Sequence, residues 1–172
     1  MNQTKTLVIN KKAIIFSAIQ FVVLMGIAIT TPLIKQQLLS GSIVNAVLFI
    51  SVALFGIQNA ILVGLIPSLV ALSSGLLPAV LAPMIPFIIA GNTILVLVFG
   101  YLRKKNYWLG MVSAGFFKFI FLLVTSSIVF DLITKKEIAS KVALMMSWPQ
   151  LFTAILGGLI AYFVLKITKK NA

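Results

Sequence analysis

Long runs of apolar residues, separated by short polar or Gly/Pro-bearing stretches, extend along the whole chain. These runs cover residues 13–34, 42–55, 59–72, 84–102, 107–130 and 142–167. A helix needs about 20 predominantly apolar residues to cross the hydrocarbon core of a bilayer. The pattern therefore predicts an all-α integral membrane protein, with residues 1–172 forming one compact bundle of six transmembrane helices and no soluble domain.

Two of the runs are short. Residues 42–55 and 59–72 each have fewer than 20 residues, and between them lie Gly56, Gln58 and Asn59. We expect a tight hairpin of two helices, either embedded among longer helices or thinning the bilayer locally. The alternative is a five-span topology, in which this pair forms a re-entrant hairpin and the two termini lie on opposite sides of the membrane.

The connections between the runs differ in composition. Residues 35–40 should form a short polar link. Residues 73–83 contain two prolines, which disfavour a straight helix, so a loop that dips toward the bundle is expected there. Residues 131–141 hold the only two acidic residues, Asp131 and Glu137, and should form a short amphipathic or irregular segment.

Charge gives the orientation. The net charge is +12, and nine of the 14 basic residues lie beside the ends of hydrophobic runs, in three clusters: Lys5, Lys11 and Lys12; Arg103, Lys104 and Lys105; and Lys166, Lys169 and Lys170. A nucleic-acid-binding face would not be confined to helix ends. Basic clusters in short connections mark the cytoplasmic side. Both termini are therefore predicted to be cytoplasmic.

The chain offers little chemistry of its own. It has no histidine or cysteine, and both acidic residues fall outside the apolar runs. The spans thus have no proton relay, catalytic carboxylate pair or metal-ligand set, and no phosphate-binding loop ends in Gly-Lys-Ser/Thr. We expect no enzyme activity, no cofactor and no metal. If the protein moves a solute against a gradient, another subunit must supply the energy.

Lys118 is the exception, because it lies near the middle of the run 107–130. A lysine at the bilayer centre costs about 2.5–3.5 kcal/mol on insertion scales and normally faces protein, water or a ligand. Helical spacing places small and polar residues on its face: Ala114, Gly115, Thr125 and Ser126. Bulky residues point mostly elsewhere: Phe116, Phe117, Ile120 and Leu123. An inward Lys118 would favour an anionic ligand. The alternative is a lysine whose long stem snorkels toward the cytoplasm.

Four further residues suggest a pocket that opens outward. Asn45 lies near the outer end of the second run, Asn92 in the outer half of the fourth, and Trp148 and Gln150 in the outer third of the sixth. Amides supply directional hydrogen bonds, and an indole offers a flat face for a ring. Alternatively, the amides join helices to each other and Trp148 belongs to the interfacial aromatic belt.

Two stretches and the six-span pattern resemble one family. The turn Phe55-Gly56-Ile57-Gln58-Asn59-Ala60-Ile61-Leu62-Val63-Gly64 is similar to its Gly-Pro-x-x-Gly-x-x-x-Gly hairpin, although Ile57 and Ala60 replace the proline and the middle glycine. The stretch Leu81-Ala82-Pro83-Met84-Ile85-Pro86, followed by Gly91-Asn92, is similar to members of the group that includes folate, pantothenate and cobalamin binders. Over nearly its whole length the chain resembles the substrate-binding S components of energy-coupling factor (ECF) vitamin transporters.

The resemblance implies a multi-pass protein of a prokaryotic plasma membrane. Such a subunit captures a vitamin or related micronutrient from outside, docks on a transmembrane coupling (T) subunit driven by two ATPase subunits, and topples in the membrane. Docking in the family uses an Ala-x-x-x-Ala pattern on the first helix, and Ala13 and Ser17 are the nearest match here. The competing hypothesis is a membrane accessory or assembly protein without a small-molecule ligand.

Overall fold

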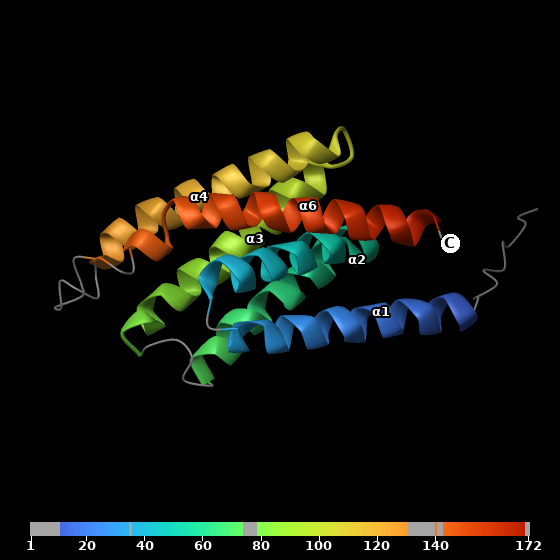
Figure 1. Cartoon of the computed structure of the whole chain (residues 1–172), viewed down its shortest axis with the longest axis horizontal. Coiled ribbons are helices and arrows are strands. Elements are labelled where there is room, and N and C mark those ends of the chain that lie inside the picture. Colours follow the sequence, from blue (N-terminus) through green and yellow to red (C-terminus); the bar gives the residue numbers. More distant parts are fainter. Residues whose placement is uncertain (1–10, 35, 74–78, 131–139, 141–142, 171–172) are drawn as a thin grey trace, which may run out of the picture.

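The computed structural model describes residues 11–34, 36–73, 79–130, 140 and 143–170 (Figure 1). Its helices are α1 (Lys11–Thr30), η1 (Thr31–Leu33), α2 (Gln37–Ser73), η2 (Ala79–Met84), α3 (Ile85–Leu102), α4 (Tyr107–Phe130) and α6 (Trp148–Lys170). Within these described residues, five segments are long and apolar enough to cross a bilayer: Ile14–Leu33, Gln37–Val70, Ala82–Leu102, Tyr107–Val129 and Ala143–Thr168. The protein is therefore an all-helical, multi-pass membrane protein over the part that is described.

Helix α2 is broken at Gly56 and folds back on itself. Gly56 has φ 83° and ψ 178°, a backbone conformation essentially restricted to glycine. In a straight helix Leu48 and Gly64 would be about 24 Å apart. Instead, a methyl group of Leu48 lies 3.2 Å from the position that a Cβ on Gly64 would take. The Asn59 side chain donates a hydrogen bond of 3.1 Å to the Phe55 carbonyl, which lies beside the break. The predicted hairpin at Gly56 is present.

The connections depart from the prediction in two places. The prediction of a polar link at residues 35–40 is wrong for most of its length, because α2 already begins at Gln37. The Gln37 side chain donates a hydrogen bond of 2.7 Å to the Met145 carbonyl, so this polar residue is used inside the bundle. The sixth apolar run was expected to form one helix from residue 142. In the structure the chain turns at Met146 and Ser147, and α6 starts at Trp148.

The other two connections are only partly described. Of the loop predicted at residues 73–83, residues 79–83 belong to the short helix η2, and residues 74–78 lie outside the described part. The amphipathic segment predicted at residues 131–141 lies outside it as well, apart from Ser140.

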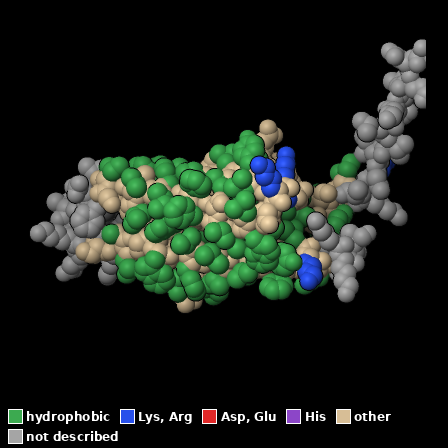
Figure 2. Space-filling view, turned by 90° about the horizontal axis from the view of Figure 1, so that it is seen from above, with side chains coloured by type: hydrophobic (Ala, Val, Ile, Leu, Met, Phe, Trp, Pro, Cys, Tyr) green, Lys and Arg blue, Asp and Glu red, His purple; other side chains and the backbone are tan. Residues whose placement is uncertain are grey.

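The helices lie roughly side by side (Figure 1). Helix α2 packs on α1, α3 and α6, and α4 packs on α3 and α6. The core between them contains Phe49, Phe99 and Leu95, all fully buried. The start of α1, the break at Gly56, the α3–α4 turn and the end of α6 lie at the same end of the bundle. Lysine and arginine side chains gather at that end, whereas apolar side chains cover its length (Figure 2).

Candidate functional site

Lys118 lies inside the bundle. Only 4% of its surface is exposed, and its ammonium donates hydrogen bonds to Asn45 Oδ1 at 2.7 Å and to Asn92 Oδ1 at 2.8 Å. The side chain therefore does not snorkel to the interface. Its two partners come from α2 and α3, so one ammonium joins three helices.

Both amides are held by further hydrogen bonds. Asn45 Nδ2 donates to Thr153 Oγ1 at 3.2 Å, and that hydroxyl donates to the Gln150 carbonyl at 3.1 Å. Asn92 Nδ2 donates to the Gly64 carbonyl at 3.2 Å. Each amide oxygen is thereby directed at Lys118. We call Lys118, Asn45, Asn92 and Thr153 the lysine–amide cluster; it connects α4, α3, α6 and both halves of α2.

Small residues allow this cluster to form. A Cβ on Gly157 would lie 2.7 Å from both the Asn45 Cβ and the Ser42 carbonyl oxygen, so α6 touches the backbone of α2 beside the cluster. A Cβ on Gly115 would lie 3.0 Å from the Ala154 Cβ, so α4 also approaches α6 closely. Such close approach puts short side chains such as asparagine within reach of a neighbouring helix.

The helical face predicted for Lys118 is confirmed. The small and polar residues expected on it are buried: Ala114, Gly115, Thr125 and Ser126. The bulky residues expected elsewhere are exposed: Phe116, Phe117, Ile120 and Leu123. The 3.6-residue period therefore predicts the helical face on which Lys118 lies, and the burial and hydrogen bonds of its side chain decide against snorkelling.

The cluster lies at mid-depth. Asn45 precedes the Gly56 break by 11 residues, Asn92 precedes Arg103 by 11 residues, and Lys118 follows Tyr107 by 11 residues. At 1.5 Å per residue each is about 16 Å from the basic end, half the thickness of a hydrocarbon core of about 30 Å. Asn45 was expected near the outer end of its helix; it lies deeper because α2 begins at Gln37.

Trp148 and Gln150 do not join Lys118. Trp148 is 56% exposed, and among the described residues its ring meets that of Phe152 alone, with centroids 6.4 Å apart, which fits the aromatic-belt interpretation. Gln150 Nε2 donates to the Met145 carbonyl at 3.0 Å, the acceptor that Gln37 also uses.

Thr153 was not predicted to be a site residue. Its spacing of three residues from Gln150 puts both on one helical face, a signal that could have indicated it.

The lysine–amide cluster supplies a positive charge that has no carboxylate partner in the part of the chain that the structure describes. Two of the three ammonium hydrogens are bonded to amide oxygens of the described residues, so a third is available to an acceptor. Toward the end opposite the basic one lies a buried apolar group: Met84, Leu122, Val129 and Met146. Among the described residues no group of histidine, cysteine, aspartate or glutamate could hold a metal ion. The chemistry of the site is therefore hydrogen bonding and charge attraction.

Comparison with known proteins identifies no relative: no family model, no curated protein and no solved structure matches this chain. The function is therefore inferred from the geometry of the site and from the residues that build it.

Proposed function

We propose that the protein is the substrate-binding subunit of an importer of the ECF type. It captures a vitamin or related micronutrient on the outer side and docks on a coupling subunit energised by partner ATPases. The observation that carries the proposal is the buried ammonium of Lys118, which has two amide partners and, among the described residues, no carboxylate partner. A substrate carboxylate or phosphate supplies the missing negative charge.

The energetics favour a role for this charge. Burying the lysine at the bilayer centre costs about 2.5–3.5 kcal/mol on insertion scales. Two hydrogen bonds from a charged donor return about 1.5–3 kcal/mol each, so the isolated cluster is close to balance. An anionic substrate at the remaining hydrogen adds attraction in a low-dielectric interior, where a single ion pair is much stronger than in water.

The proposal includes six spans with both termini in the cytoplasm. The two halves of α2, residues 37–55 and 57–73, are about 28 and 25 Å long at 1.5 Å per residue, close to the thickness of the hydrocarbon core. The chain has no cysteine, so single cysteines report topology directly. Asn106→Cys and Gln58→Cys should react with an impermeant maleimide only in inverted vesicles, and Ser73→Cys only in intact cells. Labelling of Gln58→Cys and Ser73→Cys from the same side would contradict six spans.

Helix α1 supports the docking part of the proposal. It packs on α2 through Leu24 and Ala28, whereas its first half is uncovered: each residue from 14 to 19 is exposed. The predicted small-residue pattern consists of Ala13 and Ser17. Ser17 lies in this uncovered stretch, and the Ala13 side chain is outside the described part. A helix with small residues and no neighbour can approach another helix closely. The coupling subunit is the occupant that we propose for it.

The proposal can be tested by native mass spectrometry of protein purified from cells grown in rich medium. Wild-type protein should retain a small molecule, and Lys118→Met should lose it while staying folded, because methionine keeps the length of the stem and removes the charge. Lys105→Met is the matched control, since this lysine is exposed and remote from the cluster. No small molecule in any sample, including protein incubated with a pool of vitamins, would count against the proposal.

One observation favours the accessory-protein hypothesis as a second candidate. Both amides of the lysine–amide cluster already have partners on donor and acceptor atoms, as a purely structural connection between helices requires. Under this hypothesis Lys118→Met alters stability alone, and no micronutrient binds. The same mass-spectrometry experiment therefore separates the two candidates.

A further inference from the structure

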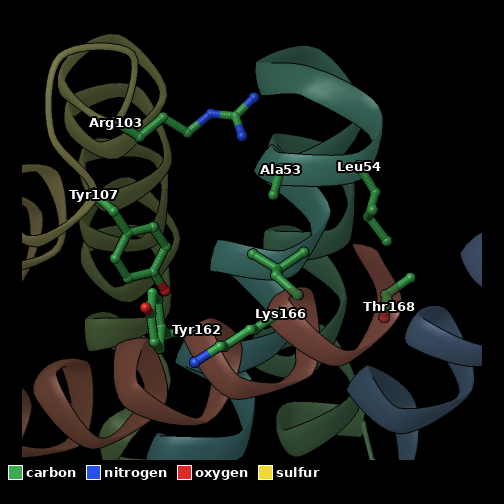
Figure 3. A pocket seen from close by; sticks show the side chains of 8 residues that line it. Ala53, Leu54, Arg103, Tyr107, Tyr162, Lys166 and Thr168 are labelled. Carbon is green, nitrogen blue, oxygen red and sulfur yellow. The ribbon is translucent and has the colours of Figure 1, made fainter. Parts of the chain in front are cut away.

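A second polar site lies at the basic end of the bundle, about half a membrane thickness from Lys118. It is a cleft of about 400 Å³ between α2, the α3–α4 turn and α6, and the residues that line it include Leu54, Arg103, Tyr107, Tyr162, Leu165 and Lys166. Figure 3 shows Arg103 extending over the cleft toward α2, and Lys166 extending along α6 toward Tyr162. Side chains from three separate elements thus converge on one space.

The cationic groups of this cleft have no anionic partner among the described residues. Arg103 Nε is buried and has no hydrogen-bond acceptor within the described part of the chain. The two carboxylates of the chain, Asp131 and Glu137, come after the opposite end of α4 in the sequence and lie outside the described part. A buried guanidinium donor without a partner is unfavourable, because it has lost its hydrogen bonds to water. The cleft therefore presents two cationic groups, Arg103 and Lys166, that suit an anion with oxygen acceptors.

The tyrosines differ in what they can offer such an anion. Tyr107 donates its hydroxyl hydrogen to the Gly158 carbonyl at 2.7 Å, so this group is already used. The Tyr162 ring packs beside those of Tyr107 and Trp108, at centroid distances of 5.4 and 4.8 Å, and its hydroxyl has no partner within the described residues. Tyr162 can thus donate a hydrogen bond beside the two cations.

We propose that this cleft binds the phosphate of an anionic phospholipid headgroup from the cytoplasmic leaflet. Arg103 and Lys166 would hold the phosphate, the Tyr162 hydroxyl would donate to it, and Leu54 and Leu165 would contact the start of the acyl chains. Planar guanidinium groups match phosphate oxygens in pairs. Basic pockets between transmembrane helices at the cytoplasmic side suit such headgroups.

Two features favour a lipid over a soluble phosphate compound. The cleft lies where α4 begins and α6 ends, which is the depth of the headgroups if these helices span the bilayer. Its wall is partly apolar and continues into the exposed apolar surface, where Leu54 is 37% exposed and Trp108 44% exposed. A free phosphate has no apolar part to place against such a wall, whereas a glycerophospholipid has both parts.

The test is lipid retention by the full chain in detergent, measured by native mass spectrometry with phosphatidylglycerol or phosphatidylcholine. Wild-type protein should retain phosphatidylglycerol about 10- to 30-fold better than phosphatidylcholine, as expected for two basic groups near a headgroup. Arg103→Gln with Lys166→Gln should remove this preference. The control, Lys11→Gln with Lys105→Gln, removes the same charge from the same end at residues that do not line the cleft and should keep the preference.

Several results would overturn the assignment. One is an equal loss of the preference for phosphatidylglycerol in both double variants, because the overall charge of this end would then explain that preference. Another is displacement of the lipid by millimolar glycerol phosphate or inorganic phosphate, which would assign the cleft to a soluble compound. Because Arg103 is partly buried, Lys166→Gln alone serves as a second variant at an exposed position, and retention of the full preference by it would also contradict the proposal.

Discussion

The lysine–amide cluster should behave as one energetic unit, and the sharpest test removes its members separately and together. Asn45→Leu with Asn92→Leu takes both acceptors from the buried ammonium. Lys118→Met takes away the charge and leaves two amide oxygens without a donor. The triple variant replaces the charge and both amides by apolar side chains of similar size.

The expected order of stability follows from the hydrogen bonds and the burial. Leaving the ammonium unpaired in the double variant should cost about 3–5 kcal/mol. Lys118→Met loses two charge-assisted bonds of about 1.5–3 kcal/mol each but regains the lysine's insertion cost of about 2.5–3.5 kcal/mol, so it should lose about 0–3 kcal/mol. The triple variant should match or exceed the wild type, because apolar replacements of a buried charged cluster are often neutral or stabilising.

The measurement is the free energy of unfolding in mixed micelles, followed by helical circular dichroism as the fraction of sodium dodecyl sulfate rises. A double variant as stable as the wild type would refute the reasoning, because the ammonium would then have other partners or reach water. Ligand retention by the same variants tests whether the cluster binds a substrate. A stable triple variant that binds no micronutrient makes the cluster a binding site, whereas full ligand retention by the triple variant would contradict that role.

Three further predictions concern backbone geometry and docking. Gly56→Ala should destabilise the hairpin by about 1–3 kcal/mol, because φ 83° with ψ 178° strains any residue that has a Cβ; an unchanged melting temperature would contradict this. Gly157→Leu should separate α6 from α2 and cost at least about 1–3 kcal/mol, whereas Gly26→Leu, with nothing within 4 Å, should be tolerated. Equal melting temperatures for these two leucine variants would refute the close packing. Ala13→Leu with Ser17→Leu should block co-purification with a coupling subunit and leave ligand binding intact; wild-type recovery of the complex would exclude this face.

Much of the architecture could be predicted from the sequence, because bilayer insertion imposes simple rules. Apolar runs of sufficient length must be helical, since backbone groups in lipid need internal partners. Gly56, followed by polar Gln58 and Asn59, indicated the reversal within α2. The 3.6-residue period placed Lys118 on a buried face, since its neighbours on that face are small and polar.

Tertiary structure decided which residues meet. Hydropathy gives neither the rotation of a helix about its axis nor its depth to within one turn. Close contacts at Gly157 and Gly115 set both the rotation and the depth of α6. They bring Thr153 rather than Trp148 to the lysine–amide cluster. The turn before α6 likewise depends on a partner far along the chain, since Gln37 bonds the Met145 carbonyl from the start of α2. The sequence by itself determined that a charge lies inside the membrane, and the packing of backbone against backbone determined what holds it there.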